Sequence, residues 1–233
     1  MNLDRVTITG IDDSTDPKAL IDLTLEFPFV EWGILFSKQH QGKPRWASYD
    51  WINNFLKVKG DMEIKLSAHL CGKWVKEFVT SGVNSFAVEN PIIWDTVQRV
   101  QLNFHATRFH PIANFGDVIA NDGKSYIFQY DGVNALLDFV KSKTKAYPLF
   151  DISGGNGILP TSWPKPEREY TGYAGGLSPD NIQEQLEKIK SVTGDSRIWI
   201  DMETRVRSDD DRILDLNKVR KCLEISSKYI KYA

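Results

Sequence analysis

The segment Tyr173-Ala174-Gly175-Gly176-Leu177-Ser178-Pro179-Asp180 runs from an apolar strand through two glycines into a helix. Upstream, Phe150-Asp151-Ile152 leads into Ser153-Gly154-Gly155-Asn156-Gly157. Downstream, the apolar run from Arg197 to Asp201 continues into Glu203-Thr204-Arg205. Glycines directly after buried strands leave backbone amides uncovered, and such amides can hold an anion without a dedicated side chain. In an eight-stranded α/β barrel the phosphate site usually follows strands seven and eight. The stretch from Phe150 to Arg207 therefore predicts the last three strands of a (β/α)8 barrel that binds a phosphorylated small molecule.

Composition narrows the class of protein. Hydrophobic residues make up 41% and charged residues 26% of the chain, which is ordinary for a soluble globular protein. The net charge of −2 gives no electrostatic reason to expect nucleic acid or an anionic membrane as a partner. No apolar run reaches the roughly 20 residues that a membrane span needs, and the start of the chain resembles no secretory leader. Cys71 and Cys222 lack metal-ligand spacing. We expect a cytoplasmic monomer or homodimer with no cofactor and no metal.

The rest of the chain alternates strand and helix patterns, which favours a parallel α/β fold. The expected strands one to five are Val6–Thr9, Phe29–Phe36, Ile64–Leu70, Ser85–Glu89 and Arg99–His105. The rival is an open doubly wound sheet, but the glycine pattern that such a sheet would carry after its first strand is missing. The pattern therefore predicts a single (β/α)8 barrel domain over residues 1–233.

Residues 107–130 complicate the strand count, because Tyr126–Gln129 would be a ninth strand. Asn121-Asp122-Gly123 stands between two strand-like runs and is a strong signal for a tight hairpin. Parallel strands need a crossover of a dozen or more residues, so a hairpin cannot belong to the barrel wall. The sequence therefore predicts a β-hairpin insertion near 107–130. Three prolines between strands six and seven also predict a reduced sixth helix.

Five segments, in order, resemble the phosphoribosylanthranilate isomerase family of tryptophan biosynthesis. Thr7 to Ile11 is similar to that family's Lys-Ile-Cys-Gly-Ile, and Pro44-Arg45-Trp46 to its Pro-Arg-Tyr. The other three segments are Asp151 with Gly154 to Gly157 and Trp163, Ala174 to Asn181, and Ile200 to Arg207. The likeness covers both ends of the chain well and roughly 60–145 poorly. It implies a barrel, a phosphate site and an Amadori-type isomerisation of an aldose to a ketose.

The resemblance implies two catalytic positions. Asp151 stands where the family's general acid protonates a furanose ring oxygen, a task that needs a raised carboxyl pKa. Thr9 stands where the family's cysteine removes a proton from the neighbouring carbon, and a threonine hydroxyl does not ionise usefully without a partner base. His69, Glu89 and His105 are candidates for a substitute base, because each is expected at a strand end. A structural role for each of the three stays open.

The resemblance also implies the binding residues. Arg45 matches the arginine that holds the substrate's carboxylate, a task suited to a planar guanidinium. Asp201, His69 and Glu89 are further expected substrate contacts. The expected phosphate contacts all lie in the loops after strands six to eight, and they are Gly154, Gly155, Gly157, Gly175, Gly176, Thr204 and Arg205. Glu203 replaces a serine of the family and would repel a phosphate, whereas Arg205 would pair with it.

Three functions stay open at this point. The first is an isomerase acting on a phosphorylated sugar, with Asp151 as acid. The second is a barrel that binds a phosphorylated metabolite without catalysis. The third is a pentulose-phosphate epimerase with a metal at His69, because Ala68-His69-Leu70 is similar to a segment of that related family; its second histidine and paired aspartates are not evident.

Overall fold

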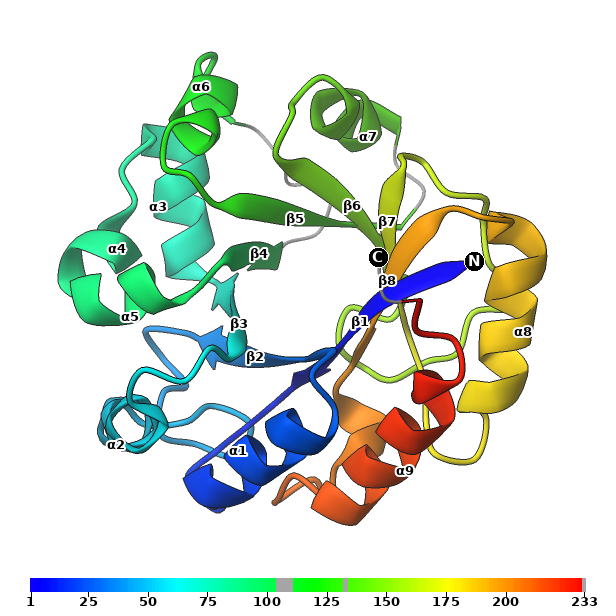
Figure 1. The fold of residues 1–233 in the computed structure, drawn as a ribbon. Coiled ribbons are helices and arrows are strands. Elements are labelled where there is room, and N and C mark those ends of the chain that lie inside the picture. The colour runs from blue at the N-terminus through cyan, green and yellow to red at the C-terminus, as the bar shows by residue number, and fades with distance from the viewer. Residues whose placement is uncertain (104–110, 132–133, 232–233) are drawn as a thin grey trace.

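Eight parallel strands close into a barrel, in the order in which they occur in the chain (Figure 1). The computed structural model describes residues 1–103, 111–131 and 134–231. The strands are β1 (Asn2–Thr9), β2 (Val30–Phe36), β3 (Lys65–Cys71), β4 (Arg99–Asn103), β5 (Ser125–Tyr130), β6 (Ala146–Phe150), β7 (Tyr170–Ala174) and β8 (Arg197–Met202). β1 pairs with both β2 and β8, which closes the ring. The predicted (β/α)8 barrel is confirmed.

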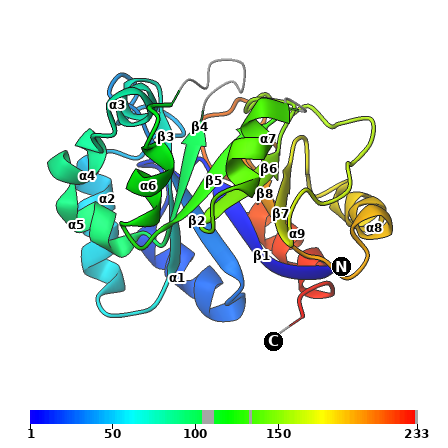
Figure 2. The ribbon, with the colours of Figure 1, turned by 90° about the horizontal axis from the view of Figure 1, so that it is seen from above.

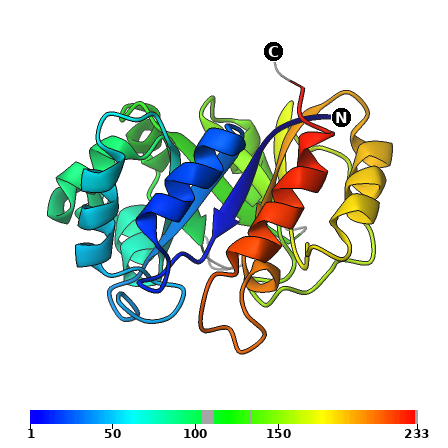
Figure 3. The ribbon, with the colours of Figure 1, turned by 60° about the horizontal axis from the view of Figure 1, so that its bottom comes forward.

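Helices surround the barrel, as Figures 2 and 3 show from two further directions. They are α1 (Pro17–Glu26), α2 (Tyr49–Lys59), α3 (Lys73–Ser81), α4 (Ser85–Glu89), α5 (Pro91–Thr96), α6 (Phe115–Ala120), α7 (Asn134–Lys141), α8 (Ile182–Thr193) and α9 (Leu216–Ser227), with a short 3-10 helix, η2 (Thr204–Val206). Figure 3 shows β1 between α1 and α9. Among the described residues, none of the helices has the length and apolar character that a membrane span requires.

The assignment of the middle strands differs from the prediction. Ser85–Glu89 is helix α4, and the Asn84 side chain caps it by accepting a hydrogen bond from the Ala87 amide at 3.1 Å. Residues 125–130 form β5, which pairs in parallel with β4 and with β6. The predicted β-hairpin insertion near 107–130 is therefore wrong. The five-residue run from Ser85 is too short for its apolar pattern to separate strand from helix.

The turn at Asn121-Asp122-Gly123 joins a helix to a strand. Asp117 to Ala120 belong to α6, and the Lys124 amide donates to the Asp122 carboxylate at 3.0 Å just before β5 begins. Gly123 has a φ of 81°, a left-handed conformation that glycine adopts without strain. The same turn residues serve hairpins and helix ends, so the motif does not specify which elements it joins.

The sixth helix is absent from residues 151–169, a fully described segment, in agreement with the prediction. Trp163 anchors this segment: its ring packs edge-on against Phe150 and Tyr173, and its indole nitrogen donates to Gln185 at 3.0 Å. The segment thereby crosses over the loop that follows β7. An added Cβ at Gly176 would lie 2.5 Å from the Leu159 nitrogen, so only glycine allows this close approach.

The interior of the barrel has an apolar side and a polar side. Ile127, Leu149, Tyr170, Ala174 and Trp199, from β5 to β8, form an apolar cluster of their own. On the opposite side, buried Glu31 of β2 accepts hydrogen bonds from Thr7 and Arg99, each at 3.0 Å, and from Arg5 at 2.7 Å. The Arg99 guanidinium lies 4.4 Å from the centre of the Trp199 ring, where the two sides meet. The amino-terminal part of the barrel is thus filled with side chains.

Gly172 makes room for the Trp199 ring inside the barrel. A Cβ at this position would lie 2.3 Å from two ring atoms of Trp199 and 2.6 Å from Leu149. We expect Gly172→Ala to lower the free energy of unfolding by about 1–3 kcal/mol, because overpacking displaces side chains from their preferred rotamers. Urea unfolding measures the loss. The same change in a Trp199→Phe background should cost less, and equal costs in the two backgrounds would contradict this account.

Candidate functional site

A cavity of about 430 Å³ lies at the carboxyl ends of the strands. Each of the eight strands contributes to its wall, either with its own residues or with the residue that follows it. Barrels of this type place their chemistry at this end, because the loops that follow the strands converge there. This cavity is therefore the candidate site.

The cavity wall contains nearly all of the predicted site residues. They are Thr9, Arg45, His69, Asp151, Gly154, Gly155, Gly157, Gly175, Gly176, Asp201, Thr204 and Arg205. Glu89 is outside it: this residue ends α4, its side chain is 56% exposed, and its carboxylate pairs with Lys38 at 3.4 Å. The strand-end position predicted for Glu89 is wrong, because the segment before it is a helix. His105 lies outside the described residues.

Asp151 follows β6 directly and is fixed by three donors. Its Oδ1 accepts hydrogen bonds from the Ser153 amide at 2.8 Å and the Ser153 hydroxyl at 2.7 Å. Its Oδ2 accepts from the Gln129 side-chain amide at 3.1 Å. These hydrogen bonds hold the carboxyl group of Asp151 in one orientation at the cavity wall.

Asp201, in β8, is a buried carboxyl group in the same wall. The Thr9 hydroxyl of β1 donates to its Oδ1 at 2.9 Å, because the two strands pair with Thr7 opposite Asp201. The pKa of Asp201 is raised to about 8, mainly by burial and also by the nearby carboxylates of Glu203 and Asp151, against the opposing effect of the Thr9 hydroxyl. A carboxyl with this pKa is largely protonated at neutral pH and can donate a proton.

His69, in β3, lies beside Thr9 at the bottom of the cavity. A Cβ at Gly33 would be 2.4 Å from the Thr9 hydroxyl oxygen and 2.9 Å from His69 Nε2, so this glycine lets the two side chains approach each other. Burial lowers the pKa of His69 to about 3, and no hydrogen-bond partner for its Nε2 is found among the described residues. A neutral imidazole of such low basicity is a poor general base, but it can hydrogen-bond a ligand.

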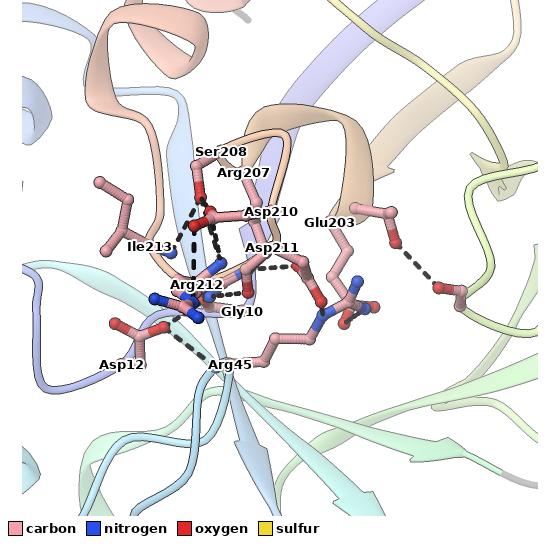
Figure 4. A network of polar contacts seen from close by, with 12 residues as sticks. Gly10, Asp12, Arg45, Glu203, Arg207, Ser208, Asp210, Asp211, Arg212 and Ile213 are labelled. Atoms are coloured by element: carbon pink, nitrogen blue, oxygen red, sulfur yellow. Dashed lines mark hydrogen bonds and ion pairs between the residues drawn. The ribbon is translucent and has the colours of Figure 1, made fainter.

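Arg45 is engaged by acidic residues of the loops that follow β8 (Figure 4). Its Nη1 donates to Glu203 Oε1 at 2.9 Å and its Nε donates to Asp211 Oδ2 at 2.7 Å. Its own backbone is in the left-handed region, with a φ of 74°, and its amide donates to Asp12 at 3.0 Å. The structure therefore places Arg45 at the cavity, as predicted, but with two carboxylates already bound.

Arg207 binds two of the acidic residues that contact Arg45. Its fully buried guanidinium donates to the Asp12 carboxylate at 2.6 Å, to the Asp211 carboxylate at 2.8 Å and to the Gly10 carbonyl. Asp12 and Asp211 each also accept a hydrogen bond from Arg45, as the dashed lines in Figure 4 show. One buried arginine therefore joins the loops after β1, β2 and β8.

The loops predicted to bind phosphate meet at one end of the cavity. The Thr204 hydroxyl donates to the Gly155 carbonyl at 2.8 Å, and Arg205 Nε donates to the Gly157 carbonyl at 3.1 Å. Within the described part of the chain, the backbone amides of Gly155, Gly176 and Thr204 have no acceptor. All three residues line the same cavity, and uncovered backbone amides are suited to an anion. Glu203 also faces this end of the cavity, where an added Cβ at Gly155 would be 3.7 Å from its Oε2.

The residues that sequence reasoning missed come mainly from β5 and the loop after β6. Gln129 falls within the wrongly predicted hairpin, which hides its contact with Asp151. Ser153 falls within a predicted glycine loop, although a serine two residues after an aspartate is a common partner for it. In the described ranges, no group of three or more His, Cys, Asp or Glu residues is placed to hold a metal ion. These residues do not fit the metal site that an epimerase with a metal at His69 would need.

No protein-family model matches the chain, and no curated protein matches its sequence. Among solved structures, the chain is similar to phosphoribosyl anthranilate isomerase from Thermus thermophilus, with 14% identity and a TM-score of 0.61 over 96% of this chain and 98% of that one. It is also similar to a chain of the tryptophan synthase a2b2 complex from Pyrococcus furiosus, with 12% identity and a TM-score of 0.53 over 96% and 100% of the two chains. A third is a structure described as native KDPGal, with 11% identity and a TM-score of 0.52 over 98% and 97%. At these identities the likeness shows the fold alone, a (β/α)8 barrel.

Proposed function

We propose that the chain is an isomerase that binds a small sugar-type metabolite in the cavity and transfers protons with Asp201 and Asp151. The observation that carries this proposal is the environment of Asp201. This buried carboxyl, whose pKa is raised to about 8, lies in one cavity wall with a second carboxylate that three donors hold as an acceptor. Two carboxyl groups in one cavity wall, one of them with a raised pKa, are suited to act as an acid and a base.

The proposed roles follow from these two environments. Protonated Asp201 donates its proton to the ring oxygen of the sugar while the bond from that oxygen to the anomeric carbon breaks. Asp151 accepts the proton that leaves the neighbouring carbon, which gives an enol. The enol becomes the ketone when a proton adds to the former anomeric carbon and the enol hydroxyl loses its proton. The substrate gains two protons and loses two, so the reaction is an isomerisation that needs no oxidant or co-reactant. Thr9 orients Asp201 by donating to its Oδ1.

This assignment differs from the roles that the resemblance implies, because Asp151 becomes the base and Asp201 becomes the acid. In the family, the residue at the place of Asp151 is the acid and a cysteine at the place of Thr9 is the base. The free amides of Gly155, Gly176 and Thr204 support a phosphate on the substrate, whereas the carboxylate of Glu203 at the same end of the cavity opposes it. The proposal therefore depends on the acid–base pair and leaves the charge of the substrate to be tested.

Solvent exchange tests the proposal with a panel of substrates. The protein is incubated in deuterated water with pentoses, pentose 5-phosphates and phosphoribosylanthranilate. Deuterium at the carbon beside the carbonyl is followed by NMR, and turnover of phosphoribosylanthranilate is followed by its fluorescence. We expect exchange with at least one member, reduced about 100-fold or more in Asp201→Asn and in Asp151→Asn, because general acid–base catalysis contributes about that much. The control is Asp61→Asn, an exposed carboxyl. Full exchange in both cavity variants would rule the proposal out.

A second function, binding of such a metabolite without catalysis, is favoured by one observation. Thr9 occupies the position of the family's catalytic cysteine, and its hydroxyl is committed to Asp201. In this case a substrate from the panel would raise the melting temperature of the protein, but no member would exchange deuterium or turn over.

A further inference from the structure

The carboxylate of Glu203 lies at the end of the cavity that is formed by the glycine-containing loops after β6 and β7. Glu203 follows β8 directly, and Arg45 fixes its Oε1 at 2.9 Å. Its Oε2 faces the Gly155 backbone and has no donor within the described part of the chain. The side chain remains 22% exposed, so a ligand in the cavity can reach it. One carboxylate oxygen is therefore free to accept a hydrogen bond beside the Gly155 backbone.

Two of the three neighbouring arginines are already paired with carboxylates. Arg45 is shared between Glu203 and Asp211, and Arg207 is buried between Asp12 and Asp211. Arg205 is exposed, with its Nε on the Gly157 carbonyl at 3.1 Å. Burial raises the pKa of the Glu203 carboxyl, and the Asp151 carboxylate raises it further, against the opposing effects of Arg45 and Arg207. A doubly charged anion beside Gly155 would thus lie against the Glu203 carboxylate, and Arg205 is the neighbouring arginine that no carboxylate pairs among the described residues.

We propose that Glu203 determines the specificity of the cavity: it disfavours a dianionic ester group beside Gly155 and favours a group that donates a hydrogen bond, such as a sugar hydroxyl. This inference rests on the proposed function, because it concerns the substrate of the same cavity. Like charges at short range in a partly buried site repel each other strongly, whereas a hydroxyl can donate to the free Oε2 and accept from the amides. The substrate class is then an unphosphorylated sugar-type molecule, or one whose phosphate lies away from Gly155.

Sulfate binding tests this inference without any turnover, because sulfate is a dianion throughout the working pH range. Glu203→Gln keeps an oxygen for Arg45 and removes the charge. We expect Glu203→Gln to bind sulfate at least tenfold more tightly than the wild type at pH 8, measured by calorimetry. The matched control Glu169→Gln neutralises an exposed carboxylate in the segment before β7, where the side chain is 84% exposed, and should bind as the wild type does. Equal affinity of Glu203→Gln and the wild type, or no sulfate binding by either, would overturn the inference.

A pH series keeps the inference testable if Glu203→Gln does not fold. Burial raises the pKa of Glu203, while Arg45 and Arg207 lower it and Asp151 raises it. As the pH falls, Glu203 takes up a proton and its repulsion of the dianion disappears. In an Asp201→Asn background, which removes the other cavity carboxyl with a raised pKa, sulfate binding should strengthen as the pH falls from 8 to 4, below the ordinary pKa of a glutamate. A flat series would overturn the inference.

The result is separable from the proposed function. If Glu203→Gln gains sulfate affinity but no sugar exchanges deuterium, the isomerase proposal fails and the role of Glu203 stands. If sugars exchange deuterium and the sulfate affinities of Glu203→Gln and the wild type are equal, the isomerase proposal is supported and the proposed role of Glu203 is rejected.

Discussion

Asp201→Asn is expected to change how the stability of the protein depends on pH. An aspartate carboxyl in an unfolded chain has a pKa of about 4, and burial raises that of Asp201 to about 8 in the folded chain. Between these values the folded chain holds a proton that the unfolded chain releases, so this group lowers the stability as the pH rises. The contribution is fully lost once the pH exceeds the folded pKa. Because one pKa unit corresponds to about 1.4 kcal/mol, the total is on the order of 5 kcal/mol.

The measurement is the difference in unfolding free energy between Asp201→Asn and the wild type, from urea unfolding at each pH from 4 to 9. Asparagine does not titrate and keeps an oxygen for the Thr9 hydroxyl. As the pH rises, the unfolding free energy of the variant should therefore increase relative to that of the wild type by up to about 1.4 kcal/mol per pH unit. This increase should level off near pH 8. Asp61→Asn changes an exposed carboxyl outside the cavity. The curve of its unfolding free energy against pH should run parallel to that of the wild type. Parallel curves for Asp201→Asn would show that its carboxyl is ionised in the folded chain.

Arg207→Met is expected to be the most destabilising single change in the loops around the cavity. The side chain of Arg207 is fully buried and donates to two carboxylates and to the carbonyls of Gly10 and Asp211. Methionine keeps much of its length but leaves the buried Asp12 carboxylate without its cation and two carbonyls without donors. Breaking a buried ion pair on one side costs about 3–5 kcal/mol.

Urea unfolding at pH 7 checks this value. Arg212→Met is the matched control, because the Arg212 side chain is 81% exposed and its ion pair with Asp210 spans 3.5 Å; exposed pairs of this kind contribute about 0–1 kcal/mol. The double variant Asp12→Asn with Arg207→Met should lose less stability than the sum of the two single losses. If Arg207→Met unfolds at the same urea concentration as Arg212→Met, the network does not support the loops.

The carboxyl-terminal third of the barrel is well specified by local sequence. Glycines that directly follow apolar strands mark places where a backbone turns sharply, and this information is local. Gly155, Gly176 and Thr204 are therefore expected near one another, and they line one cavity. The middle of the chain is harder to predict, because Asn121-Asp122-Gly123 marks a turn without marking the elements that it joins. Because of this one error, β5 is assigned to a hairpin outside the barrel, and the contact of Gln129 with Asp151 is not predicted.

The electrostatics of the site cannot be read from the sequence. The pKa of Asp201 depends on burial and on carboxylates of Asp151 and Glu203, which the closed barrel brings together. Arg45 is correctly predicted at the cavity, but its contact with Asp211 joins residues 166 positions apart. Such pairings arise from the closure of the whole ring, so no local pattern predicts them.

The charges inside the barrel have a consequence for the seam at which β1 meets β8. Arg5 of β1 points inward to Glu31, and Asp4 holds Arg197 of β8 at 2.7 Å. If thermal motion opened the barrel at this seam, the newly exposed edge of β1 would present ionic groups that water solvates readily. Strand edges with inward-pointing charges resist pairing with the edges of other molecules. We therefore expect the ion cluster to disfavour aggregation of a molecule that has opened between β1 and β8.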